Sequence, residues 1–212
     1  MVASSSSVPK PDLWQKQVVD FGASEVCGVD EAGRGPLAGP VVVAAVILDA
    51  NRPIAGLDDS KKLSASKRET LYSQIVAAAT AYNIQRISPR IIDEINILQA
   101  TLRGMQQAAL AIVTSASTIL IDGNRVPKEL LGRARAVVKG DGKYAAIAAA
   151  SILAKVTRDR IMEEYDAIYP GYGFAQNKGY PTKQHLAAIR NLGITPIHRK
   201  TYKPVQQLTL DF

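Results

Sequence analysis

The feature that most constrains the fold of this chain is a pair of apolar runs with a charged break between them, VCGVDEAGRGPLAGPVVVAAVIL. Two β-branched runs separated by a segment rich in glycine and proline predict neighbouring strands, over residues 25–30 and 40–48, joined as a hairpin. The break carries Asp30, Glu31 and Arg34. Charges are costly to bury, so their position beside a future core makes these residues the first candidates for a functional site.

The rest of the chain alternates between helical and strand patterns. Apolar residues at three- and four-residue spacing predict helices over residues 65–81, 88–113, 143–168 and 182–191, the second being either one helix or two abutting ones. Short β-branched runs predict further strands over residues 83–88, 118–122 and 135–139. No internal repeat is visible, so this alternation indicates a single α/β domain.

Composition and charge narrow the function classes. The chain has 212 residues, a net charge of +7 and a pI of about 9.5, which favours a polyanionic partner such as nucleic acid. A single cysteine, Cys27, excludes an internal disulfide framework and a multi-cysteine zinc site, and it favours a reducing compartment. No apolar run is long enough to span a bilayer or to form a signal-peptide core. We therefore expect a cytoplasmic protein with no membrane partner.

Three segments are expected along the chain. Residues 1–12, rich in serine with two prolines, have the composition of a flexible leader. Residues 13–204 form the folded domain, and residues 205–212 form a tail.

Four carboxylates are expected to meet at the ends of strands. Asp30 and Glu31 end the first strand, Asp122 ends a later one, and Asp141 follows a third. Strand ends gather functional residues in α/β sheets, but four carboxylates close together repel one another and need cations. Oxygen ligands suit Mg²⁺ or Mn²⁺, and two such ions are the usual device for displacement at phosphorus.

A simpler interpretation stays open for part of this set. Asp122 and Asp141 each stand in a DG sequence after a strand, where aspartate commonly caps its own backbone in a turn. The adjacent pair Asp30 and Glu31 is harder to explain in this way. In a regular strand, however, neighbouring side chains point to opposite faces, so we expect the strand to end at this pair.

Many short segments together resemble one family, the bacterial ribonucleases HII: VCGVDEAGRGPLAGPVV, DSKKLS, IDEINILQATL, IDGN, VVKGD, AAASILAKVTRDR, YGFAQNKGYPT and HRKTY. The resemblance runs from about Val26 to Pro204. It implies a ribonuclease H-like α/β fold, with a mixed five-stranded sheet flanked by helices and a helical C-terminal extension. It also implies hydrolysis of the RNA strand of RNA/DNA hybrids and incision 5′ to ribonucleotides embedded in duplex DNA, leaving 3′-OH and 5′-phosphate ends.

The resemblance also assigns roles to residues. The family's acidic tetrad, which is catalytic and binds two divalent ions, Mg²⁺ or Mn²⁺, falls on Asp30, Glu31, Asp122 and Asp141. The family's ribonucleotide-recognition element falls on Gly33, Arg34 and Gly35, and its sugar-packing tyrosine falls on Tyr180. Basic residues in matching motifs, expected to hold phosphates, are Lys61, Lys62, Lys155 and Lys178.

One position departs from the family's pattern, and two residues receive no role. Many relatives have histidine where this chain has Asn177, so a proton-handling role of that histidine would be absent here. His185 and His198 are more simply structural, because a lone histidine on a helix or loop is seldom catalytic.

The C-terminal residues QQLTLDF carry a separate signal. Gln207, Leu210 and Phe212 fit a Q-x-x-L-x-F pattern that is similar to peptides binding the bacterial sliding clamp. The alternative is that Leu208, Leu210 and Phe212 pack back onto the domain. The family resemblance further implies a monomer.

Two other functions compete with the ribonuclease. One is a basic nucleic-acid-binding module in which the carboxylates only cap turns; its binding would be indifferent to Mg²⁺. The other is a different two-metal nuclease, such as a junction resolvase, built on a similar sheet.

Overall fold

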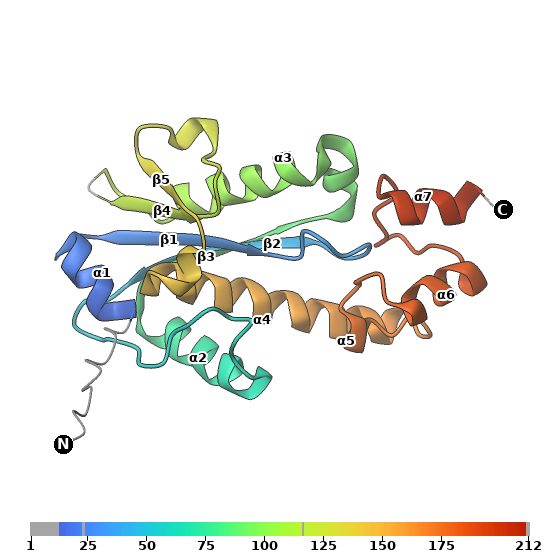
Figure 1. The fold of residues 1–212 in the computed structure, drawn as a ribbon, viewed down its shortest axis with the longest axis horizontal. Helices are drawn as coiled ribbons and strands as arrows, with labels where there is room; N and C mark the ends of the chain where they lie inside the picture. Colours follow the sequence, from blue (N-terminus) through green and yellow to red (C-terminus); the bar gives the residue numbers. More distant parts are fainter. Residues whose placement is uncertain (1–12, 23, 116, 211–212) are drawn as a thin grey trace, which may run out of the picture.

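The computed structural model describes residues 13–22, 24–115 and 117–210 and shows a sheet between two layers of helices (Figure 1). The expected leader lies outside the described residues. Within them, no helix is long and apolar enough to cross a membrane.

The sheet has five strands in the order β3-β2-β1-β4-β5. The β1–β2 and β2–β3 pairs are antiparallel, whereas β1–β4 and β4–β5 are parallel. The predicted hairpin and the predicted mixed five-stranded sheet are therefore confirmed. The strands are β1 (Val26–Ala32), β2 (Val41–Leu48), β3 (Ala79–Ile87), β4 (Thr118–Asp122) and β5 (Ala134–Val137).

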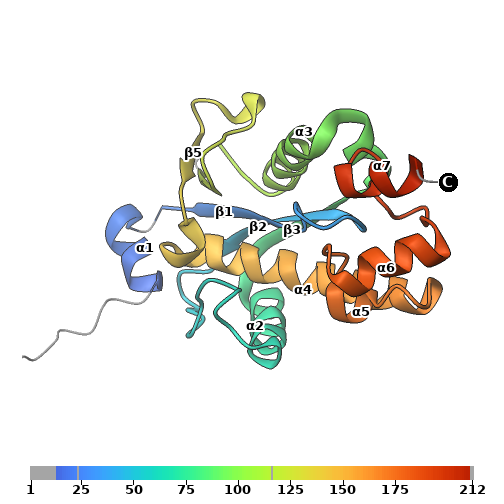
Figure 2. The same cartoon turned by 45° about the vertical axis from the view of Figure 1, so that its right-hand side comes forward.

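Helices cover both faces of the sheet, with α3 on one face and α1, α2 and α4 on the other (Figures 1 and 2). The short helices α5, α6 and α7 gather at the far end of α4, which is the predicted helical extension. The bounds are α1 (Leu13–Phe21), α2 (Ala65–Ala78), α3 (Pro89–Leu110), α4 (Ala145–Ile168), α5 (Phe174–Asn177), α6 (Lys183–Leu192) and α7 (Lys203–Leu210), with 3-10 turns η1 (Lys128–Leu130) and η2 (Gly140–Gly142).

The alanine-rich half of α4 lies directly on the sheet. A Cβ at Gly28 of β1 would stand 2.1 Å from the carbonyl carbon of Ala146, so only glycine permits this approach. Every residue of β2 is buried, since helices cover both of its faces. The close packing of α4 against β1 sets the side chains of its middle turns beside the charged end of β1.

Several boundaries differ from those predicted. The helix predicted to reach residue 81 ends at Ala78, and β3 starts at Ala79 instead of residue 83. Pairing of Ala79 with Leu48 outweighs the helical preference of the alanines. The segment predicted as one or two helices is two, since Asn96 breaks α3 with φ 64°.

The C-terminal and β5 boundaries differ as well. The β5 strand ends at Val137 instead of residue 139, because Lys139 turns the chain with φ 55°. The tail expected to begin at residue 205 lies partly inside α7, and Val205 is fully buried.

Candidate active site

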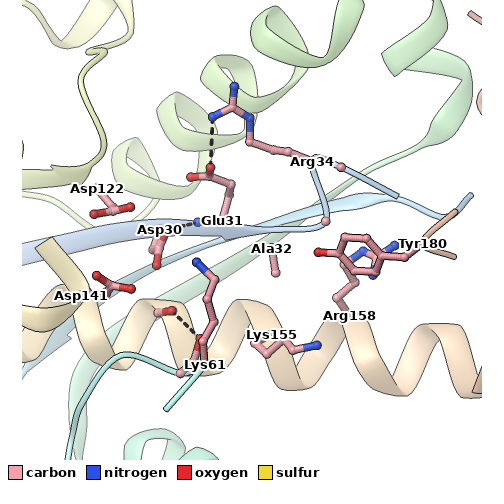
Figure 3. Close-up of a pocket in the computed structure, with 14 residues that line it drawn as sticks. Asp30, Glu31, Ala32, Arg34, Lys61, Asp122, Asp141, Lys155, Arg158 and Tyr180 are labelled. Atoms are coloured by element: carbon pink, nitrogen blue, oxygen red, sulfur yellow. Dashed lines mark hydrogen bonds and ion pairs between the residues drawn. The ribbon is translucent and has the colours of Figure 1, made fainter. Parts of the chain in front are cut away.

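A cavity of about 410 Å³ opens at the charged end of β1. Figure 3 shows three of its carboxylates gathered at one end and Arg158 and Tyr180 at the other. Most of the predicted site residues meet in this cavity. Those lining it are Asp30, Glu31, Gly33, Arg34, Gly35, Lys61, Asp122, Asp141, Lys155 and Tyr180.

The adjacent carboxylates reach this cavity in a way that the sequence did not predict. Strand β1 continues to Ala32, so the expectation that it ends at the pair is wrong. Asp30 and Glu31 stand opposite Ala44 and Val43 of β2, which belong to the cores on opposite faces. The side chains therefore do alternate, but pairing of β1 with β4 stops at Val29. The cavity lies beyond this point, where Asp30 and Glu31 both line it.

Backbone amides hold three of the carboxylates. Oδ1 of Asp30 accepts the N–H of Glu31 at 2.7 Å, and Oδ1 of Asp141 accepts the N–H of Gly142 at 2.9 Å. Oδ1 of Asp122, at the end of β4, accepts the N–H of Gly140 at 2.6 Å. Asp141 thus makes a local turn bond, as the simpler interpretation expects, whereas Asp122 binds a residue of a distant segment. Both aspartates also line one common cavity.

The protein compensates the negative charge of the carboxylate cluster only in part. Burial raises the pKa of Asp30 well above its ordinary value, and the charges of Glu31 and Asp122 raise it further. Burial also raises the pKa of Glu31 and of Asp141. The nearest cations, Arg34 at 3.4 Å from Glu31 and the ammonium of Lys61, oppose this rise only in part. The carboxylates are held close together at a cost in free energy.

The arrangement is not a preformed metal cage. Within the part of the chain that the structure describes, no three acidic, histidine or cysteine side chains stand close enough to hold one ion. The donor set nevertheless suits a hard cation, because it consists of carboxylate oxygens. Burial raises these pKa values most and repulsion between the carboxylates raises them further, and a divalent cation would offset both effects.

The glycine-rich loop after β1 forms the other side of the cavity. Gly33 has φ +97°, and a Cβ there would stand 2.0 Å from Nε of Arg158, so glycine is required. At Gly35 a Cβ would meet only Cε1 of Tyr180, at 3.5 Å, an ordinary contact. Glycine at position 35 is therefore not needed by the fold and leaves space beside the half-exposed Tyr180 ring.

The predicted phosphate-binding lysines do not all face the cavity. Lys61 and Lys155 line it, and Lys155 also pairs with Asp159 at 2.7 Å. Lys178 does not line it, because its ammonium pairs with Glu163 at 2.8 Å. Lys62 lies on the surface, paired with Asp58 at 3.0 Å.

Sequence reasoning missed three polar residues of the cavity. Ser60 and Ser151 line it and share a hydrogen bond of 2.9 Å. Ser151 also bonds to Asp30 and favours its ionised form. It lies one helical turn before Lys155, and a serine inside the alanine run of α4 was a usable signal. Arg158, which also lines the cavity, gave no such signal, since its burial depends on distant segments.

Asn177 and the histidines hold the loop that carries Tyr180. The Asn177 amide donates to the carbonyl of Tyr172 at 2.7 Å and accepts the N–H of Gly179 at 2.7 Å. His185 and His198 are buried and lie 3.1 Å apart, Nε2 to Nε2, with Nδ1 of His185 at 2.9 Å from the Tyr180 carbonyl oxygen. A structural role thus accounts for all three residues.

Comparison with known proteins decides the family. A family model described as Ribonuclease HII matches residues 27–205. A ribonuclease HII of Francisella tularensis subsp. tularensis is 56% identical over 183 residues, which are 86% of this chain and 97% of that protein. The chain belongs to the ribonuclease HII family.

Solved structures agree with this assignment. The ribonuclease H2 of Pyrococcus horikoshii OT3 superposes with a TM-score of 0.73 at 30% identity, over 88% of this chain and 98% of that one. A structure of the PCNA:RNase HII complex from Archaeoglobus fulgidus gives 0.65 at 29% identity, over 84% and 95%. The ribonuclease H-like fold is confirmed.

Membership of the ribonuclease HII family makes the protein a ribonuclease H, a hydrolase that cleaves the RNA strand of RNA/DNA hybrids. Of the alternatives above, the binding module without a reaction is therefore wrong. The cavity just described is the candidate active site.

Proposed function

We propose that this ribonuclease HII also incises duplex DNA on the 5′ side of an embedded ribonucleotide, by two-metal-ion catalysis that leaves 3′-OH and 5′-phosphate ends. The observation that carries the proposal is the joining of two elements in one cavity. Four carboxylates, the groups that hold cations, line one part, and a glycine loop with Tyr180 lines the other. A single bound ribonucleotide would contact both.

The glycine loop and Tyr180 would recognise the ribose. The open space at Gly35 admits a sugar close to the backbone, and the 2′-OH is the group that distinguishes RNA from DNA. The Tyr180 ring, 47% exposed, would pack against the sugar that follows, where an added hydroxyl would collide. The 2′-OH then serves recognition and does not act as the nucleophile.

Asp30, Glu31, Asp122 and Asp141 would hold the two divalent ions, Mg²⁺ or Mn²⁺. Bound there, such ions lower the pKa of water and stabilise charge on the leaving oxygen. The backbone amides fix one oxygen each of Asp30, Asp122 and Asp141, which orients these carboxylates before any cation binds. Lys61, Lys155 and Arg34 line the cavity as cations for the phosphates, and such contacts fix position without reading sequence.

One assay separates this proposal from the alternatives. Three labelled substrates are compared: a duplex with one ribonucleotide, an all-DNA duplex and a four-way junction, each with Mg²⁺, Mn²⁺ or chelator. We expect incision only of the first, only with a cation, and with a 3′-OH end. Incision of the junction, or of the ribonucleotide duplex in chelator, would contradict the proposal.

Two variants test the separate elements. Asp122→Asn should abolish incision while the affinity for the duplex largely survives, because the fold keeps the acceptor oxygen for the N–H of Gly140. Lys178→Ala should leave incision nearly unchanged, because its ammonium is engaged by Glu163. Retained turnover of Asp122→Asn at saturating Mg²⁺ would refute the role of this residue.

We also propose that the C-terminal peptide binds the sliding clamp. The relative from Archaeoglobus fulgidus was solved with PCNA, and Gln207 is exposed at the end of the chain. The side chain of Leu210 and all of Phe212 lie outside the described residues. Removing residues 207–212 spares the buried Val205 and should abolish clamp association in a pull-down while hydrolysis of short duplexes persists. Undiminished association would contradict this.

A further inference from the structure

Two arginines are buried behind the glycine loop without acidic partners. Arg158 of α4 is 2% exposed, and Arg199, in the segment before α7, is 0% exposed. In residues 13–22, 24–115 and 117–210, no carboxylate forms an ion pair with either guanidinium. Burial lowers the pKa of both, to about 10 for Arg158. A buried cation without a counter-ion is costly unless every N–H is bonded.

Carbonyl oxygens of the glycine loop take the place of the missing acids. Arg199 donates to the carbonyls of Gly33, of Arg34 at 2.8 Å, and of Gly39 at 3.0 and 2.9 Å. The Tyr202 hydroxyl, which accepts from Arg199 at 3.0 Å, donates to the same Arg34 carbonyl at 2.7 Å. A residue of the C-terminal extension thus fixes the loop that follows β1.

Arg158 holds the same loop from the other side. It donates to the carbonyls of Pro40 and Ala38, both at 3.0 Å, and of Lys178 at 2.9 Å. The N–H of Leu37 also donates to the Gly179 carbonyl at 2.8 Å. The loop after β1 and the loop before Tyr180 are therefore fastened to one another.

The direction of these carbonyls sets the direction of the amides. In a trans peptide, the N–H of one residue points opposite to the C=O of the residue before it, and the described chain contains no cis peptide. Carbonyls of Gly33 and Arg34 turned inward onto Arg199 therefore turn the N–H groups of Arg34 and Gly35 away from it. Both residues line the cavity, so these two amides are available to a ligand bound there.

We propose that Arg199 is a positioning residue for ribonucleotide recognition, which orients and polarises the amides of Arg34 and Gly35 toward the sugar-phosphate. A cation bound at a peptide oxygen withdraws charge and makes the N–H of the same peptide a stronger donor. The inference rests on the proposed function, since it names the groups that set the preference for ribose at that site. Arg199 itself does not touch the nucleic acid.

The test measures preference, not activity. On an Asp122→Asn background, which blocks turnover, fluorescence anisotropy gives the affinity for a duplex with one ribonucleotide and for the all-DNA duplex. Arg199→Ala and Arg199→Lys should reduce the ratio of these affinities by about 10- to 100-fold, the effect of losing two hydrogen bonds. Added guanidinium should restore part of the ratio in Arg199→Ala, whose cavity can accept it, and not in Arg199→Lys.

Controls distinguish failure of the proposed function from failure of the proposed role of Arg199. Arg90→Lys, at an arginine paired with Glu94 on the surface, should leave the ratio unchanged. If the parent protein shows no preference for the ribonucleotide duplex, the proposed function fails. If the parent shows the preference and a folded Arg199 variant keeps it, the role of Arg199 is overturned.

A milder variant keeps the proposal testable if the Arg199 variants do not fold. Tyr202→Phe keeps the ring and Arg199 but removes one donor to the Arg34 carbonyl. It should lower the ratio by about two- to tenfold, as loss of one hydrogen bond does. If neither Arg199 variant folds, Tyr202→Phe decides: a lowered ratio supports the proposal and an unchanged one overturns it.

Discussion

The two ends of the cavity bury charge in opposite ways. At one end, carboxylates crowd together and keep acceptor capacity that the protein does not fill. At the other, Arg158 and Arg199 are buried even more deeply, but backbone carbonyls accept their hydrogen bonds. At both ends, burial shifts the pKa values in the direction that favours the neutral form, upward for Asp30, Glu31 and Asp141 and downward for the two arginines. Only the carboxylate end leaves its charge to be compensated by something from outside.

This difference separates a binding site from its support. A guanidinium offers five donors in a fixed plane. Arg199 makes five hydrogen bonds, four of them to carbonyls of the glycine loop, and Arg158 makes three, all to carbonyls. Asp30, Asp122 and Asp141 each receive one backbone N–H, which orients them without neutralising them. The arginine end can therefore keep the loop in a fixed geometry, whereas the carboxylate end has the charge and the free acceptor oxygens that suit a cation.

Removing charge at each end should have opposite effects on stability. Arg158→Met leaves three carbonyls without donors and should lower the free energy of unfolding by about 3 kcal/mol, at about 1 kcal/mol for each lost bond. Asp30→Asn relieves burial of a repelled carboxylate and should raise the free energy of unfolding of the metal-free protein. Urea denaturation at pH 7 measures both. If both variants lose the same free energy of unfolding, the carboxylates and the arginines are equally well compensated by the protein.

The two loop glycines offer a finer contrast between support and binding. Gly33→Ala combines positive φ with a clash against Arg158 and should destabilise the fold by about 1–3 kcal/mol. Gly35→Ala meets no such obstacle and should keep stability within about 0.5 kcal/mol. Its methyl group would nevertheless enter the space beside Tyr180 and displace a bound sugar, lowering ribonucleotide incision by about 100-fold. Thermal unfolding and single-turnover kinetics on the same samples check this. If the Gly35→Ala variant incises at the parent rate, the sugar does not bind beside residue 35.

Sequence reasoning predicted the carboxylate end better than the guanidinium end. Asp30, Glu31, Asp122 and Asp141 stand in short motifs at strand ends, and strand ends can be located from local patterns. Arg158 and Arg199 carry no local signal, because most of the carbonyls that accept their hydrogen bonds lie in the loop after β1, more than 100 residues away. The predicted boundary between α2 and β3 was wrong for a related reason. Ala79 pairs with Leu48 of β2, and this pairing outweighs the helical preference of alanine. The meeting of Asp30 and Glu31 in one cavity depends on where β4 stops pairing with β1, which no pattern within β1 reveals.

The pH dependence of stability should reveal the carboxylate end on its own, with a smaller effect. Burial raises the folded-state pKa of Asp30, Glu31 and Asp141 above the unfolded values. Their contribution to stability is therefore fully present below the unfolded values, about 4, and is lost as pH rises through the raised ones. The buried His198, whose pKa falls to about 4, acts in the opposite direction, because its contribution is lost as pH falls below its unfolded value.

Comparing the metal-free parent with Asp30→Asn cancels the histidine contribution, because both proteins keep His198. The parent should gain stability relative to the variant as pH is lowered from 7 toward 4, since only the parent can take up the proton at residue 30. Saturating Mg²⁺ at pH 7 should stabilise the parent more than the variant, because the cation offsets the repulsion that protonation otherwise relieves. A difference in unfolding free energy that stays constant across this pH range, with and without Mg²⁺, would mean that Asp30 is already compensated. The two ends of the cavity would then bury charge alike.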